Sequence, residues 1–255
     1  MHQSELTTKP LYWLKMASFG LFLGRGWQFL FWEQQVSFWP HNPGLIHTIG
    51  LALLIGAILV WIPRFNKPGF DNYLFVLAAP LFLMSVVSWE EKDFMLAQLI
   101  EMTGQWITPV ILWLALRNYS SRVIGRWLKV AIALIFTGHG LYAAGIYPRP
   151  GNFYAMTQSI LGVSYASAGM FLLAAGVMDL FVSAGIFIRS LSTYLLIYAV
   201  IWGLLTATAR PLAYIDFSTF EGMLNGLHEW LPAMVYRLPH GLLPLAAVFI
   251  PKWSN

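Results

Sequence analysis

The segments LFLGRGWQFLFWEQQ (residues 21–35) and LIFTGHGLYAAGIYPR (residues 134–149) lie at matching places in the two halves of this chain. Each is apolar around one polar residue that stands between two glycines, Arg25 in the first segment and His139 in the second. A charged or titratable side chain inside a membrane helix is costly unless it is paired or functional. The two segments therefore indicate an internal duplication and mark the first candidate site residue of each half.

The composition is typical of a membrane protein. Of the 255 residues, 58% are hydrophobic and 10% are charged, whereas a soluble domain carries roughly 25% charged residues. The chain has no cysteine, which excludes disulfides, thiolate metal sites and iron–sulfur ligation by its side chains. The net charge is +4 without a dense basic cluster, so we expect no nucleic-acid partner.

Apolar stretches of about 20 residues, the length that crosses a bilayer, predict eight membrane helices. They lie near residues 12–34, 44–63, 72–89, 94–116, 125–147, 157–187, 191–209 and 231–250. Pro239 and Pro244 predict a kink in the eighth helix. Residues 210–231 form the longest outer connection, for which we expect a short interfacial helix or docking surface, or else a solvated loop.

The charged residues between these helices sort onto two sides. One side carries Lys9, Lys15, Arg64, Lys67, Arg117, Arg122, Arg126, Lys129, Arg189 and Lys252; the other carries Glu33, Glu90, Glu91, Asp93, Glu101, Asp216, Glu221 and Glu229. Lysine and arginine in short connections stay in the cytoplasm. We therefore expect a bacterial-type inner (cytoplasmic) membrane with both termini inside, lipids around the bundle, and a soluble partner on the acidic outer face.

Three further pairs of segments align in the same order. Residues 49–61 match 168–181, residues 74–94 match 195–217, and residues 104–116 match 239–250, which aligns Gln105 with His240. We predict an all-α polytopic membrane helix bundle of about eight transmembrane helices in two parallel four-helix repeats, residues 1–120 and 121–255. The alternative is chance similarity between apolar stretches.

The second half resembles the DoxX-like superfamily of membrane proteins. The resemblance is carried by Phe136-Thr137-Gly138-His139-Gly140-Leu141-Tyr142 and by the small-residue-rich stretch from Gly162 to Gly176. Where a family lysine usually follows the glycine motif, this chain has Ala143-Ala144-Gly145. The resemblance implies a four-helix membrane unit that is quinone-linked or accessory to a redox complex.

Arg25 has two interpretations. Gln28 follows it by one turn on the same helix face, and together they can bind a quinone carbonyl, a carboxylate or a lipid headgroup. Alternatively, Arg25 forms a structural ion pair with Glu33 or Glu101. Arg210 is a second candidate for such a pair, either with acidic residues of the other half or with a soluble partner.

His139 and His240 are expected at one depth on facing helices, with Tyr142 one turn after His139. Two such histidines suit bis-histidine haem b or a proton-coupled quinone site. Alternatively, each is hydrogen-bonded to the backbone or to Tyr142, Tyr236 or Glu229. Asp179, a carboxylate well inside a predicted helix, suggests a proton relay or, more simply, a partner for Ser183.

These features leave three functions open, and no catalytic residue is assigned. The first is a structural or accessory subunit of a larger membrane redox or energy-converting complex, with other membrane subunits as partners. The second is a quinone-reactive oxidoreductase subunit, with quinone or haem b as the candidate cofactor. The third is a small-solute transporter, which parallel repeats allow.

Overall fold

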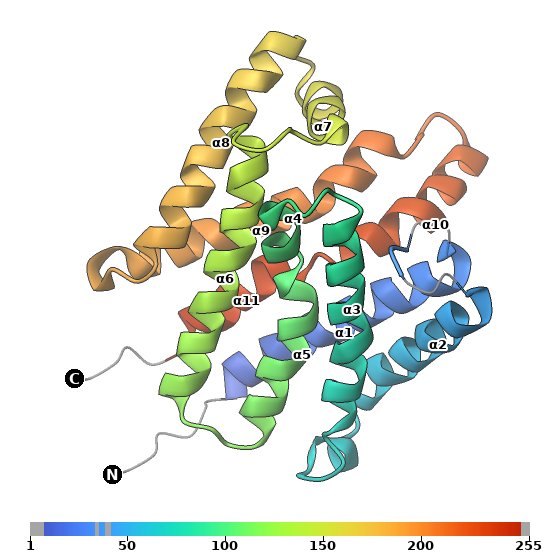
Figure 1. Ribbon diagram of the computed structural model, residues 1–255, viewed down its shortest axis with the longest axis vertical. Coiled ribbons are helices and arrows are strands. Elements are labelled where there is room, and N and C mark those ends of the chain that lie inside the picture. The colour runs from blue at the N-terminus through green and yellow to red at the C-terminus, as the bar shows by residue number, and fades with distance from the viewer. Residues whose placement is uncertain (1–7, 34–35, 39–41, 251–255) are drawn as a thin grey trace.

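The computed structural model describes residues 8–33, 36–38 and 42–250 (Figure 1). These residues form helices and connections and contain no β-strand. The helices are α1 (Thr8–Phe31), α2 (Pro43–Leu59), α3 (Tyr73–Glu90), α4 (Leu96–Glu101), α5 (Thr103–Leu116), α6 (Ser121–Ala143), α7 (Gly151–Leu161), α8 (Tyr165–Gly185), α9 (Arg189–Tyr214), α10 (Phe220–Val235) and α11 (Pro239–Val248). The predicted all-α class is confirmed.

Four segments are long and apolar enough to cross a membrane: α3, the continuous rod of α4 and α5, α8, and α9. Their outward faces are apolar too. On α8, Leu173, Val177 and Phe181 are exposed at four-residue spacing, and α9 exposes Ile197, Ile201 and Leu205. Such stripes would be unfavourable in water and suit contact with lipid tails. The four helices indicate a membrane protein.

Two of the eight predicted helices are divided in the structure, whereas the predicted helix 94–116 matches the continuous span of α4 and α5. The range 157–187 contains the end of α7 and all of α8, and the range 231–250 contains the end of α10 and all of α11. Gly162 separates α7 from α8 with a φ of +63°, a conformation in which a helix ends. Hydrophobic length alone does not reveal such breaks.

The connection predicted at 210–231 is also shorter than expected. The α9 helix continues through Arg210 and Pro211 to Tyr214, and α10 begins at Phe220. Thr219 caps α10 by accepting a hydrogen bond from the backbone N–H of Gly222. The prediction that Arg210-Pro211 ends the helix was therefore wrong, because Pro211 is accommodated inside it.

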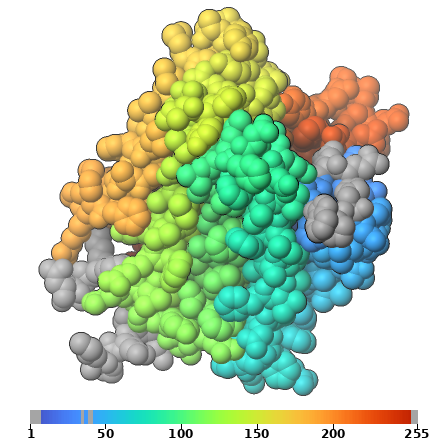
Figure 2. Space-filling model, viewed as in Figure 1, coloured from blue at the N-terminus to red at the C-terminus, as the bar shows by residue number. Residues whose placement is uncertain are grey.

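The first helix of each half packs in the same manner. The α1 helix contacts α2, α5, α10 and α11, and α6 contacts α8, α11, α4 and α5. Each therefore touches the short broken helix of the other half, α10 for α1 and α4 for α6. Figure 2 shows the green segment of α4 and α5 beside the yellow-green α6, and both helices contact α6, so the two halves form one continuous body.

The glycines that flank Arg25 and His139 make these contacts possible. A Cβ on Gly24 would lie 2.5 Å from the backbone nitrogen of Tyr236, and a Cβ on Gly138 would lie 2.6 Å from that of Glu101. The second glycine of each motif faces the next long helix: Gly26 meets α2 at Gly50, and Gly140 meets α8 at Gly176. Small residues allow this close approach of helix backbones.

An ion pair joins the beginning of α3 to the end of α5. The Arg117 guanidinium donates two hydrogen bonds to the Asp71 carboxylate, at 2.9 Å from Nε and 3.0 Å from Nη2. This contact holds the pKa of the fully buried Asp71 below its usual range. Bidentate geometry of this kind is the strongest form of an arginine–carboxylate contact.

Candidate functional site

Arg25 forms a closed centre in the first half. Its Nε donates to Oε1 of Gln105 at 2.7 Å, and its Nη1 donates to Oε1 of Gln28. The guanidinium carbon also lies 3.7 Å from the ring centroid of Tyr236, a cation–π contact. The amide oxygens and the aromatic ring satisfy this buried cation without a carboxylate.

The two carboxylates suggested as partners of Arg25 lie beside histidines in the structure. Glu33 lies 3.6 Å from His47, and Glu101 lies 3.7 Å from His139. The physical reason is the position of α4, which ends against Gly138 on α6 and so brings Glu101 to the second half's centre. The expected pairing of Arg25 with Glu33 or Glu101 is thus replaced by its contacts with glutamine.

His139 and His240 come together in the second half, as the sequence suggested. Their ring centroids are 5.1 Å apart in an edge-to-face arrangement. Nδ1 of His139 faces Oε1 of Glu101 at 3.7 Å, and Nδ1 of His240 donates to the backbone carbonyl of Arg237 at 2.7 Å. Nε2 of His139 is buried and has no hydrogen-bond partner among the described residues.

Local sequence explains how these side chains meet. Gly138 permits α4 to approach α6 at Glu101, and Gly203 permits α9 to approach α11, where an added Cβ would lie 2.4 Å from the backbone oxygen of His240. Pro239 occupies the start of α11, where its missing N–H costs nothing. The kink predicted at Pro239 is therefore the gap between α10 and α11, and it directs His240 toward His139.

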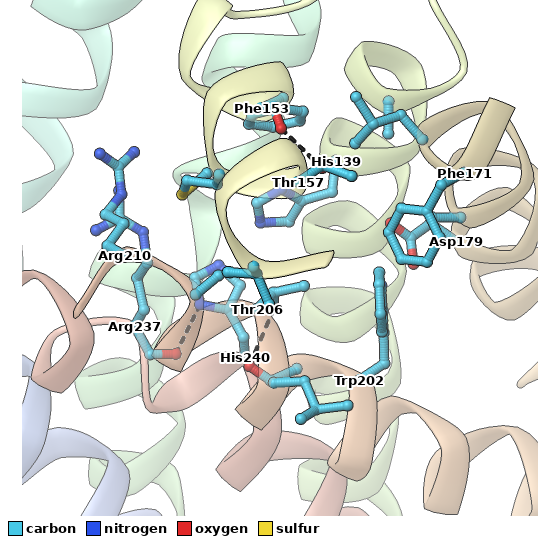
Figure 3. A pocket seen from close by; sticks show the side chains of 18 of the residues that line it. His139, Phe153, Thr157, Phe171, Asp179, Trp202, Thr206, Arg210, Arg237 and His240 are labelled. Atoms are coloured by element: carbon cyan, nitrogen blue, oxygen red, sulfur yellow. Dashed lines mark hydrogen bonds between the residues drawn. The ribbon is translucent and has the colours of Figure 1, made fainter. Parts of the chain in front are cut away.

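A cavity of about 360 Å³ lies beside the two histidines (Figure 3). It is lined by residues of α6, α7, α8, α9 and α11, most of them apolar, including Phe153, Ile160, Leu161, Phe171, Leu172 and Trp202. Its polar wall consists of Glu101, His139, Asp179, Arg210, Arg237 and His240. An apolar cavity with a few converging polar groups is the usual form of a small-molecule site.

Arg210 and Arg237 form the cationic side of the cavity. Figure 3 shows them together on the side opposite Asp179 and Trp202. Arg237 donates to the backbone oxygen of Ala233 at 2.9 Å, and the salt bridges found among the described residues involve neither arginine. Both also line a second, polar chamber of about 220 Å³ with Gln28, Trp32, Glu229, Trp230 and Tyr236. Arg210 thus lines cavities, and its expected ion pair is not formed.

The remaining predicted residues lie apart from the cavity. The Tyr142 hydroxyl donates to Oε1 of Gln98 at 3.3 Å, and Gln28 is bonded to Arg25 and reaches only the polar chamber. Ser183 bonds to the backbone oxygens of Asp179 and Ala133, so it does not pair with the Asp179 carboxyl. Arg237 went unrecognised, although an arginine between Tyr236 and Pro239 in an apolar stretch was a usable signal.

The histidine pair does not fit a haem as it lies here. A bis-histidine haem needs the macrocycle between the two rings, whereas His139 and His240 touch edge to face. The described residues also hold no group of three or more histidine, aspartate or glutamate side chains arranged for a metal ion. The arrangement suits hydrogen bonding and proton exchange with an organic ligand better than metal ligation.

Comparison with family models, with curated proteins and with solved structures finds no match to this chain, so the resemblance to the DoxX-like superfamily stays a prediction.

Proposed function

We propose that this protein is an integral membrane subunit of a redox complex and that it binds a quinone-type amphiphile in the cavity beside His139 and His240. The ligand's polar ring lies against the histidines, and its apolar tail lies among the side chains of α7, α8 and α9. Electrons would come from a partner subunit, while this chain holds the ring and exchanges protons with it.

One observation carries the proposal: His139, whose Nε2 is buried without a hydrogen-bond partner among the described residues, is a lining residue of a largely apolar cavity. A buried nitrogen without a hydrogen bond costs roughly 1–3 kcal/mol, and a carbonyl or hydroxyl of a bound ring would remove that cost. An accessory subunit with a purely structural role needs no such cavity.

The cavity mouth favours a membrane-soluble ligand. Phe171, Ile160 and Leu161 line the cavity and are also 40%, 41% and 48% exposed at the surface. We expect an opening bordered by apolar side chains of the membrane-length helix α8 and of the adjoining α7 to face lipid tails, where long-chain quinones are dissolved. A polar substrate would meet an unfavourable entrance there, which makes the transporter hypothesis weaker.

The arrangement in two four-helix repeats and the orientation in the membrane belong to the same proposal. The paired glycine contacts of α1 and α6 support two four-helix repeats, and the DoxX-like resemblance supports a quinone-linked role. In Figure 1, the α2–α3, α5–α6 and α8–α9 connections lie toward one end of the bundle, and the α3–α4 and α9–α10 connections lie toward the other. The first group carries Arg64 and Arg117, which supports placing it in the cytoplasm.

Titration of the protein in lipid nanodiscs with decyl-substituted 1,4-benzoquinone tests the proposal, with quenching of tryptophan fluorescence as the readout. Trp202 lines the cavity and should be quenched on binding. We expect His139→Leu and His240→Leu to weaken binding about tenfold each, the effect of one lost buried hydrogen bond. His47→Leu, on the partly exposed start of α2, is the control and should bind as the native chain does. Equal affinity in all four proteins would refute the site.

A further inference from the structure

Asp179 is a second unsatisfied polar group in the wall of the same cavity. It lies on α8 and is 4% exposed, and its Oδ1 has no hydrogen-bond partner among the described residues. The carboxyl interacts with the Trp202 side chain, whereas Ser183, one turn on, bonds to the Asp179 backbone. Trp202 therefore serves the carboxyl group, while one of its oxygens, Oδ1, stays buried without a donor among the described residues, in a side chain that lines the cavity.

The buried oxygen of Asp179 destabilises the fold unless a ligand supplies the missing hydrogen bond. A polar oxygen without a partner in an apolar interior costs about as much as a lost hydrogen bond, and an unpaired charge costs far more. Intramembrane carboxyl groups are rare and are usually functional for this reason. Because leucine at this position would fill similar space without the cost, the carboxyl is best explained by a contact that forms on binding.

The position of Asp179 relative to His139 defines what the ligand must carry. The two residues come from adjacent helices, α8 and α6, and both line the cavity. In Figure 3, Asp179 and Trp202 lie on the side away from Arg210, Arg237 and His240. The rings of Phe171 and Trp202, with centroids 6.1 Å apart and planes inclined by 60°, form an aromatic wall at that end.

We infer that the ligand is a flat ring with oxygen atoms at both ends, one facing Nε2 of His139 and the other facing Oδ1 of Asp179. This inference rests on the proposed function and narrows it to 1,4-quinones and their quinols. A neutral carboxyl group donates to a quinone carbonyl, and a carboxylate accepts from a quinol hydroxyl. Asp179 can therefore bind both redox forms through one contact, as donor to the quinone carbonyl and as acceptor from the quinol hydroxyl.

Two probes with the same tail separate this inference from simple apolar binding: decyl-substituted 1,4-benzoquinone, with two ring oxygens, and 4-decylphenol, with one. Calorimetric titration of the protein in nanodiscs measures both. We expect Asp179→Leu to weaken quinone binding about tenfold and to leave phenol binding within about twofold. Asp179→Asn keeps a hydrogen-bond donor and an acceptor and should lose no more than about threefold for the quinone.

Ser183→Ala is the matched control on the same helix, since its hydroxyl serves the backbone and does not line the cavity. The Asp179→Leu protein should melt at or above the native temperature, because it loses an unsatisfied group. Native quinone affinity in Asp179→Leu, or an equal loss for both probes, would overturn the inference while leaving the histidine site intact. Failure of the native protein to bind either probe would overturn the proposed function and the inference together.

Discussion

The Gly24-Arg25-Gly26 and Gly138-His139-Gly140 motifs use the same backbone packing to build two different centres. In each, the first glycine lets a short helix of the other half approach closely. That helix brings Tyr236 over Arg25, at 3.7 Å, and Glu101 beside His139, also at 3.7 Å. In each, the fourth segment of the same half supplies a contact, Gln105 to Arg25 and His240 to His139.

The difference lies in what remains unsatisfied. The Arg25 centre is closed, because amide oxygens and an aromatic ring surround the guanidinium. The His139 centre is open, because Nε2 of His139 has no hydrogen-bond partner among the described residues and the His139 side chain lines a cavity. Two motifs with equivalent backbone packing thus differ in whether their polar residue keeps an unsatisfied atom, and this difference appears in the hydrogen bonds rather than in the fold.

The largest effect on folding should come from disrupting the close glycine contacts that the two motifs share. Gly24→Val and Gly138→Val each place a side chain within 2.6 Å of backbone atoms of a neighbouring helix, which cannot move without displacing that helix. We expect each variant to lose most of its folded, monodisperse protein, since overpacking costs roughly 1–3 kcal/mol even where side chains can adjust. Size-exclusion chromatography in detergent measures the yield.

Gly151→Ala, where an added Cβ meets nothing within 4 Å, is the control and should behave as the native chain does. If only one of the two valine variants lost its fold, the two centres would not depend on equivalent contacts.

The second prediction compares how much Arg25 in the closed centre and His139 in the open centre contribute to stability. Arg25→Met leaves Gln105 and Gln28 without their buried donor and should lower stability by about 2 kcal/mol. His139→Leu removes a ring whose Nε2 is already unpartnered, so its stability should change by less than about 1 kcal/mol. Thermal unfolding followed by circular dichroism compares the two, and the opposite order would mean that His139 is the structural residue.

The smallest effect concerns the Asp71–Arg117 pair, which clamps α3 to α5 in the half with the closed centre. Because Arg117 lowers the pKa of Asp71 in the folded protein, the pair's stabilisation is fully present above the ordinary aspartate pKa of about 3.9. It is lost as the pH falls through the lower folded-state pKa. Asp71→Asn should melt a few degrees below the native protein at pH 7, and this difference should shrink below about pH 4. A difference independent of pH would show that charge is not what the clamp contributes.

The sequence predicts the helical class from the length of its apolar stretches. It predicts the meeting of His139 with His240 because the first and fourth predicted helices of a half are expected to be neighbours and both histidines lie at a similar depth from the outer side. The break between α10 and α11 was expected from Pro239, whereas the end of α7 at Gly162 was not located, since an apolar stretch has the same composition whether it forms one helix or two.

The partners of the charged residues could not be predicted for a different reason. Which carboxylate meets Arg25 depends on how α4 crosses α6, a tertiary contact fixed by Gly138 rather than by any local pattern. Asp179 was visible as a buried carboxylate, but the sequence could not show that its oxygen lies beside a cavity. Hydrogen-bond satisfaction is a property of three-dimensional packing, so it appears only in the structure.

The cavity has an exposed apolar rim, formed partly by Phe171, Ile160 and Leu161. This rim decides in which units the concentration of the proposed ligand should be expressed. A molecule that enters between these side chains comes from the bilayer, so its effective concentration is its mole fraction among lipids. Doubling the lipid at constant total ligand would then halve this mole fraction and weaken the driving force for binding by RT ln 2, about 0.4 kcal/mol, although the aqueous volume is unchanged. Affinities for this protein are therefore properties of a two-dimensional solution, and they should be compared at equal ligand-to-lipid ratio.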